Sequence, residues 1–178
     1  WSKASNTVYN LLVGHEVGHA LYTPNTDLSD CGCPKSYINV TEDARIEKLM
    51  KRKYPGLSKD FFRGYEELDQ DDFFSIKDEE LDLLPLVDRI NLHFKIGAYS
   101  MMPFTPSETP LRDAVGAAET FEEAVAAAVA IYEYMKEEQE KEKTKISAPV
   151  NPDSTGGGDE SEQQSEERPW FTDDDPMD

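Results

Sequence analysis

The stretch LLVGHEVGHALYTP, from Leu11 to Pro24, carries the strongest structural and chemical signal in the chain. It contains His15, Glu16 and His19 in the spacing H-E-x-x-H. Two histidines four residues apart on a helix lie one turn apart on the same face, so both imidazoles can reach one ion at about 2.0–2.1 Å. Glu16 lies about 100° round the helix, where it can act as a general base without being a ligand. The stretch therefore predicts a zinc site with His15 and His19 as ligands and Glu16 as the catalytic residue.

The surroundings of the motif predict a buried helix over Ser5–Tyr22, which Pro24 ends because proline disfavours helix in the residue before it. H-E-x-x-H also occurs by chance, and the alternative is a core helix that happens to carry two histidines. Buried imidazoles without partners are costly, so the apolar surroundings favour the metal site. A helix that is apolar nearly all round is typically buried, and here the apolar residues are Val8, Leu11, Leu12, Val13, Val17, Ala20 and Leu21.

A zinc site needs a third protein ligand, and the second predicted helix, about Val40–Lys53, offers candidates. At about 100° per residue, Glu42 falls inside the apolar stripe of this helix and Asp43 falls at its margin. We predict Glu42 as the third ligand and Asp43 as its substitute. Glu42 could instead close a capping box with Asn39. Asp43 and Glu47, four residues apart, could instead accept hydrogen bonds from the ligand histidines.

Other polar residues carry weaker signals. A lone histidine such as His93 is more often a core or surface residue than a metal ligand. Cys31 and Cys33, with no second pair, are expected to be free cysteines in the loop between the two ligand helices rather than a soft-metal site. Tyr22 or Tyr37 could supply an oxyanion donor. The charged set Asp88, Arg89 and Lys95 is expected to form a solvated or salt-bridged helix face.

The rest of the chain also predicts helices, and no strand pattern is convincing. A T-x-x-E capping box at Thr120 and Glu123 opens the clearest helix, Phe121–Lys143, whose second half is polar all round and should project into water. We therefore predict a mainly α domain over residues 1–145. The other predicted elements of this domain are short helical turns within 57–77, a helical stretch over about Asp78–Tyr99 that is interrupted or entered near Pro85, and a loop over Met101–Pro110.

Charge is unevenly distributed along the 178 residues, which carry a net charge of −19. Residues 146–178 contain ten acids and one arginine, and their low-complexity composition predicts a disordered acidic tail or linker. The acidic excess argues against nucleic-acid binding, which needs clustered lysine and arginine.

The compartment is inferred from cysteine usage and hydropathy. Two cysteines do not make a secreted disulfide framework, and no apolar run approaches the roughly 18 residues needed to span a membrane. We therefore expect a cytoplasmic protein. The chain begins at Trp1, close to the first helical pattern and without an initiator methionine, so we expect it to be a fragment of a longer protein.

Four motifs together resemble a known family: GHEVGHALYTP, NVTEDARIEKLMKRKYPG, DRINLHFKIG and TFEEAVAAAVAIYEYM. They are similar to zincin-like proteins of tailed bacteriophages, related to the cobaltochelatase T-subunit and von Willebrand factor A group. The resemblance covers about residues 1–145, with the acidic tail as the start of a linker. It implies a zinc site from His15, His19 and an acid of EDARIE, with Glu16 catalytic, and a MoxR-type AAA+ ATPase as partner. It also implies the host-cell cytoplasm for a phage-encoded protein.

Two functions follow from these expectations. The first is a zinc metallopeptidase that hydrolyses a peptide or protein substrate through a metal-activated water. The alternative is a non-catalytic module in which zinc ties two helices together, or an accessory subunit that works with an AAA+ ATPase. A structural zinc site usually has four protein ligands. Only three are visible here, which favours the peptidase.

Overall fold

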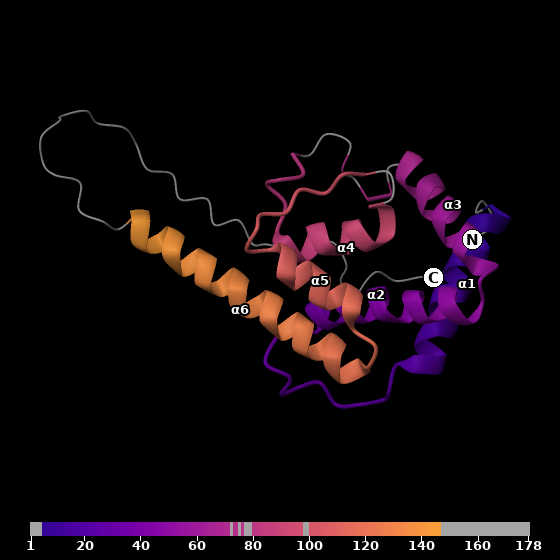
Figure 1. Cartoon of the computed structure of the whole chain (residues 1–178), viewed down its shortest axis with the longest axis horizontal. Coiled ribbons are helices and arrows are strands. Elements are labelled where there is room, and N and C mark those ends of the chain that lie inside the picture. The colour runs from indigo at the N-terminus through magenta and orange to yellow at the C-terminus, as the bar shows by residue number, and fades with distance from the viewer. Residues whose placement is uncertain (1–4, 72, 75, 77–79, 98–99, 147–178) are drawn as a thin grey trace, which may run out of the picture.

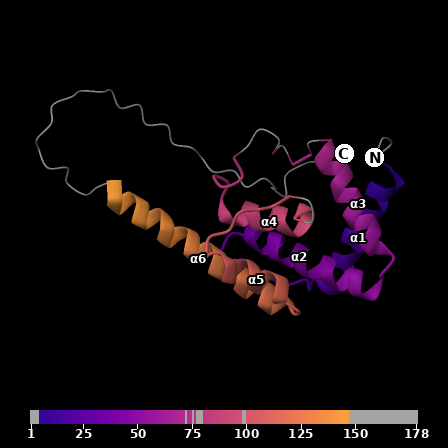
Figure 2. The same cartoon turned by 45° about the horizontal axis from the view of Figure 1, so that its top comes forward.

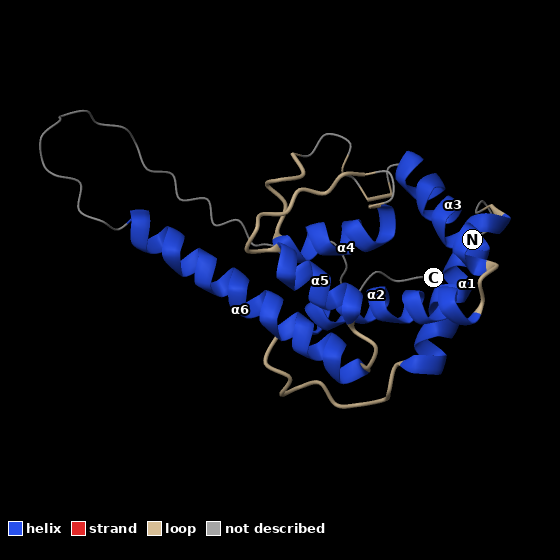
Figure 3. Ribbon diagram, in the orientation of Figure 1, coloured by secondary structure: helices blue, strands red, loops and turns tan. Residues whose placement is uncertain are grey.

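The computed structural model describes residues 5–71, 73–74, 76, 80–97 and 100–146, which form a mainly α fold (Figures 1 and 3). Within these ranges there is no strand, which confirms the prediction of a mainly α fold. Of the predicted acidic tail, 146–178, residue 146 is the last of a helix, and 147–178 lie outside the described residues. The helices are α1 (Asn6–Tyr22), α2 (Lys35–Lys53), α3 (Leu57–Gln70), α4 (Leu86–Ile96), α5 (Thr109–Ala117) and α6 (Phe121–Ile146).

Helix α2 is the central element and contacts each of the other five helices (Figures 1 and 2). Two of its buried residues belong to core clusters: Val40 to one shared with α4 and α6, and Ile38 to one shared with α6. A third cluster joins α1, α3 and α4 around Phe61 and Leu92. This central position makes α2 the platform against which the histidine-bearing helix α1 is placed.

Helix α1 is buried on one face only, so the prediction of a helix buried all round is wrong. Its inner face consists of Val8, Leu11, Gly14 and Gly18. The opposite face is exposed because α3 and α2 both pack on the glycine side of the helix, at Gly14 and Gly18 respectively. On that outer face Tyr9, Val13, Val17 and Leu21 are between 39% and 52% exposed.

Two glycines allow the helices around the motif to approach closely. A Cβ on Gly18 of α1 would lie 3.1 Å from side-chain carbons of Ile46 and Met50 on α2. A Cβ on Gly64 of α3 would lie 2.8 Å from Leu11 on α1. Because Gly18 is next to His19, the close approach of α1 to α2 brings the histidine pair against the acidic residues of α2.

Helix α2 begins at Lys35, five residues before the predicted start. Pro34 precedes the first turn with φ −59°, which is compatible with helix initiation. The added turn buries Ile38 against Phe121 and Ala128 of α6, a long-range contact that the local sequence does not reveal. Asn39 therefore lies inside the helix, and the alternative of a capping box between Asn39 and Glu42 is wrong.

The remaining elements agree in part with expectation. Residues expected to form short turns form one continuous helix, α3, because its Phe61 and Tyr65 are buried together in the core. Helix α4 begins directly after Pro85, where the predicted helical stretch was expected to be interrupted or entered, and α5 was not predicted. The capping box of α6 is confirmed, with the Glu123 amide 3.2 Å from Thr120 Oγ1 and the Thr120 amide 3.0 Å from Glu123 Oε2. From Lys136 to Lys145 this helix is exposed all round and extends beyond the other helices (Figures 1 and 2).

None of the described helices combines the length and the apolar character that crossing a membrane requires.

Candidate metal centre

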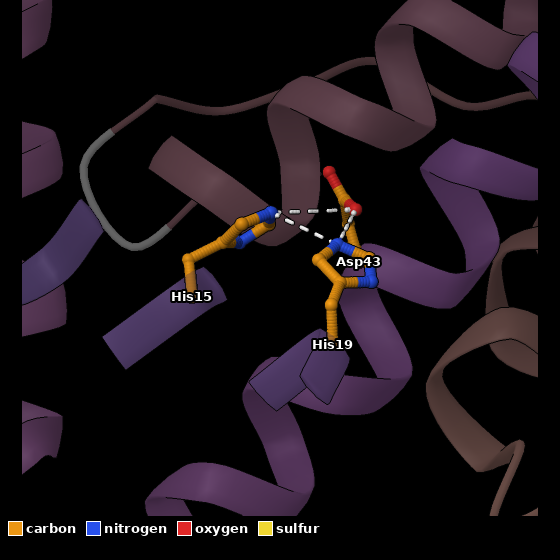
Figure 4. A group of neighbouring side chains, drawn as sticks. All are labelled: His15, His19 and Asp43. Atoms are coloured by element: carbon orange, nitrogen blue, oxygen red, sulfur yellow. Dashed lines mark hydrogen bonds and ion pairs between the residues drawn. The ribbon is translucent and has the colours of Figure 1, made fainter. Parts of the chain in front are cut away.

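Three metal-ligating side chains converge between α1 and α2 (Figure 4). His15 and His19 come from α1 and Asp43 comes from α2. His19 Nε2 lies 3.2 Å from His15 Nε2 and 3.1 Å from Asp43 Oδ1, and His15 Nε2 lies 3.6 Å from the same oxygen. The side chains are 16%, 31% and 17% exposed, so the group is enclosed on most sides and reachable from solvent.

The size of this triangle fits a small tetrahedral cation. An ion with bonds of about 2.0–2.1 Å separates its ligand atoms by about 3.4 Å when the geometry is tetrahedral. The three edges of 3.1, 3.2 and 3.6 Å bracket that value. Two imidazoles and one carboxylate are also the donor set that zinc accepts at sites with an open fourth position.

His15 is oriented by a buried acid. Its Nδ1 lies 3.0 Å from Glu47 Oε1, and because a carboxylate only accepts, Nδ1–H is the donor. Glu47 is 3% exposed and also accepts a hydrogen bond from the hydroxyl of Tyr65 on α3. This arrangement leaves the Nε2 lone pair of the neutral His15 ring directed at the other two ligand atoms. It agrees with the expectation that Glu47 could accept a hydrogen bond from a ligand histidine.

His19 is oriented through a hydroxyl relay. Its Nδ1 lies 3.0 Å from Thr23 Oγ1, and Thr23 Oγ1 donates to Glu42 Oε1 at 2.6 Å. Because the threonine proton goes to Glu42, the Thr23 oxygen accepts from Nδ1–H of His19. Both histidines therefore carry a proton on Nδ1 and turn Nε2 towards the centre. Fixing the tautomer in this way is what an outer layer of hydrogen bonds does at metal sites.

The predicted order of preference, Glu42 before Asp43, does not match this geometry. Glu42 is 2% exposed, as its place in the apolar stripe implied. Its carboxylate, however, forms a two-point ion pair with Arg45, at 2.6 Å to Nη2 and 2.7 Å to Nε, and accepts from Thr23. Arg45, one turn further along the same face of α2, supplies the positive charge that a bound cation was expected to supply. Asp43 takes the place beside the histidines.

Electrostatics keeps Asp43 ionised. Burial favours its neutral form, but the ammonium of Lys95, the hydrogen bond with His19 and the nearby His15 together lower the pKa of the Asp43 carboxyl to about 2. Lys95 Nζ, from α4, donates to Asp43 Oδ2 at 3.2 Å. For His15, burial disfavours the charged ring, but the hydrogen bond to Glu47 and the charge of Asp43 raise its pKa above the ordinary value.

Glu16 follows His15 directly on α1 and is exposed to solvent. It is not part of the group formed by His15, His19 and Asp43.

The other candidate residues do not join the metal group. His93 packs between the rings of Phe94 and Phe104, and burial followed by the charge of Arg112 lowers its pKa. Cys31 and Cys33 are free, as expected. Tyr37 donates to Met135 Sδ at 3.4 Å. Asp88 and Arg89 are 7% and 8% exposed, so the charged face is salt-bridged and buried rather than solvated.

Three residues of the site were not identified as such from the sequence. Thr23 carried a usable signal, because it lies four residues after His19, at the end of the same helix. Lys95 and Tyr65 carried none, because they approach from α4 and α3 through tertiary packing.

Comparison of the chain with protein-family models, with curated proteins and with solved structures found no match.

Proposed function

We propose that this chain is the metal-binding part of a zinc-dependent metallopeptidase, with His15, His19 and Asp43 as ligands and Glu16 as the general base. The observation that carries the proposal is the convergence of two Nε2 atoms and one carboxylate oxygen within 3.1–3.6 Å, beside the exposed Glu16. The same atoms hydrogen-bond to one another through an imidazole proton, and a cation that binds between them would displace that proton.

The donor set fits zinc by its chemistry. Imidazole nitrogen and a single carboxylate oxygen suit zinc, whereas calcium and magnesium prefer sites made of oxygen ligands. When bound, zinc supplies a Lewis acid that lowers the pKa of water towards about 7 and polarises a carbonyl group.

The chain's own residues supply the remaining chemistry. Glu47 and Thr23 hold the two imidazoles in the tautomer that presents Nε2. Glu16 accepts the proton of the water that attacks the scissile carbonyl carbon. The C–N bond of the peptide then breaks, and Glu16 delivers the proton to the departing amine nitrogen. General acid–base help of this kind typically contributes about 10²–10⁴-fold to a rate.

The experiment compares the purified chain with its Glu16→Gln variant. Elemental analysis should find one zinc per chain in both proteins. A peptide library scored by mass spectrometry should show cleavage by the unmodified chain that a chelator abolishes and zinc restores. The Glu16→Gln variant should lose at least about 100-fold of that activity. Full activity in the variant would remove Glu16 from its role.

A different result distinguishes the alternative function. Zinc bound in both proteins with no cleavage by either would favour a non-catalytic metal-stabilised module over a peptidase. Absence of zinc from the unmodified chain would remove both proposals.

A further inference from the structure

The two carboxylate oxygens of Asp43 face different partners. Oδ1 faces the histidine nitrogens, at 3.1 Å from His19 Nε2. Oδ2 accepts a hydrogen bond from Lys95 Nζ at 3.2 Å. The oxygen that points away from the histidines is therefore engaged by a cationic donor from a third helix.

The position of Lys95 requires an explanation because burying an ammonium group is costly. Its side chain is 9% exposed, less than the 17% of Asp43 that it contacts. Helix α4 supplies none of the three ligands, yet it carries this lysine to the back of the metal group. An ion pair of this kind restricts how the carboxylate can rotate and which of its oxygens is open to a cation.

We propose that Lys95 is a specificity-determining positioning residue that limits Asp43 to binding a metal through one oxygen. The inference rests on the metal site of the proposed function, and it does not depend on peptide hydrolysis. One-oxygen binding suits a small four-coordinate ion such as zinc or cobalt. Larger ions that take six or more ligands, such as manganese or calcium, gain from a carboxylate that offers both oxygens.

The charge of Lys95 has a separate effect that the test must remove. An ammonium beside the site weakens the binding of every divalent cation by a similar amount, because the repulsion depends on charge and distance. This electrostatic repulsion cancels in the ratio of two affinities. The zinc-to-manganese affinity ratio therefore reports how Asp43 coordinates, whereas either affinity alone does not.

The experiment measures zinc and manganese dissociation constants for the full chain and for the Lys95→Met and Lys95→Arg variants by chelator competition. Lys95→Met frees Oδ2, and its zinc-to-manganese affinity ratio should fall by about tenfold or more. Lys95→Arg keeps a cationic donor, so it should retain most of the original ratio. The visible spectrum of the cobalt complex should change in Lys95→Met from intense four-coordinate bands to weaker bands of higher coordination.

The matched control is Lys48→Met. Lys48 is also a partly buried lysine that joins helices, but it bonds to the carbonyls of Gly116 and Ala118 and pairs with Glu119. The Lys48→Met substitution should leave the zinc-to-manganese affinity ratio and the cobalt spectrum unchanged. Circular dichroism reports whether each variant is folded.

Failure of the inference differs from failure of the proposed function. If the unmodified chain binds no zinc, the metal site itself is wrong. If it binds zinc but the ratio and spectrum are the same in folded Lys95→Met, Lys95 only joins α4 to α2. Should Lys95→Met not fold, the cobalt complex of the unmodified chain decides: four-coordinate bands support one-oxygen binding and six-coordinate bands overturn it.

Discussion

Glu42 and Asp43 are neighbours on α2, but their carboxylates have different surroundings. A rotation of about 100° along the helix separates them. Glu42 points into the core, where Arg45 neutralises it and Thr23 donates to it. Asp43 points towards α1, where it meets the histidine pair. One acid therefore stabilises the layer behind the metal group, and the other belongs to the group.

This division predicts opposite effects of two substitutions. Asp43→Asn should lower zinc affinity by more than about 100-fold, because an amide oxygen is a much weaker ligand than a carboxylate. Glu42→Gln should keep one zinc per chain but lose about 3 kcal/mol of unfolding free energy, because Arg45 is left buried without its counter-charge. Zinc titration and urea denaturation measure the two effects. Loss of zinc from a folded Glu42→Gln protein, with zinc retained by Asp43→Asn, would reverse the assignment.

The sequence predicts the local half of this site and misses the long-range half. The histidine pair and Glu16 lie within five residues on one helix, so their geometry follows from helical spacing alone. Which acid lies beside the histidines depends on how α2 is rotated against α1. A helical wheel of α2 centred on its apolar stripe favours Glu42, the acid that points into the core. That acid is buried as predicted, but an arginine three residues later satisfies its charge. Lys95 lies 52 residues from Asp43, so only tertiary packing brings the two together.

At the scale of elements, Gly64 sets how closely α3 approaches α1. A Cβ at this position would lie 2.8 Å from Leu11 Cδ1 and 3.0 Å from Leu11 Cβ. The second atom sits next to the backbone and cannot rotate away. Gly64→Ala should therefore cost about 1–2 kcal/mol in unfolding free energy, because overpacking outweighs the gain in helix propensity of about 1 kcal/mol.

Gly116→Ala is the matched control. In α5 its Cβ would lie 3.4 Å from the ring of Phe94, which is an ordinary contact distance. Its stability should be unchanged or slightly higher. Urea midpoints of the two variants provide the comparison. Equal midpoints would show that the close contact between α1 and α3 does not penalise a Cβ at position 64.

The pair Arg89–Glu108 joins α4 to the start of α5 and predicts a pH dependence. Arg89 Nη2 lies 2.6 Å from Glu108 Oε1, and both side chains are 9% exposed. The hydrogen bond from Arg89 lowers the pKa of Glu108 despite the opposing effect of burial, and the Thr105 amide lowers it further. A carboxylate whose pKa is lower in the folded state stabilises the fold above its unfolded pKa of about 4.3. This stabilisation is lost as the pH falls through the folded pKa.

Glu108→Gln should therefore be less stable than the unmodified chain at pH 7, by about 3 kcal/mol. This difference in unfolding free energy should shrink as the pH falls below about 4.3, because protonation removes the charge of Glu108 in the unmodified chain. Urea denaturation at pH 7 and at successively lower pH values measures it. A constant difference at every pH would mean that Glu108 acts through packing rather than through its charge.

Elements whose signals are local are predicted best. The α6 start is fixed by Thr120 and Glu123, two residues of the same turn, and the sequence identifies it correctly. The α2 start and all of α3 depend on partners elsewhere, since Ile38 packs on α6 and Gly64 packs on α1. The outer face of α1 shows the same limit. Apolar residues all round a helix predict burial, but only the packing shows that α2 and α3 share one side of it.

At the scale of the whole molecule, the candidate metal group links the first helix to the central one. His15 and His19 belong to α1, Asp43 belongs to α2, and Lys95 extends the link to α4. The hydrogen bonds behind the ligands reach further, through Tyr65 on α3 and through Arg45 to the carbonyl of Glu119 before α6. A cation bound here would therefore act on the contacts of most of the described helices.

This connectivity predicts that zinc stabilises the whole fold. A ligand that binds only the folded state adds about 4 kcal/mol when its free concentration is a thousand times its dissociation constant. For a domain of this size the melting temperature should rise by on the order of 10 °C. Circular dichroism at 222 nm, with saturating zinc and with a chelator, measures the shift. The His15→Ala/His19→Ala variant should melt at one temperature in both conditions, and magnesium should not replace zinc. An equal zinc-dependent rise in that double variant would place the stabilising ion elsewhere in the chain.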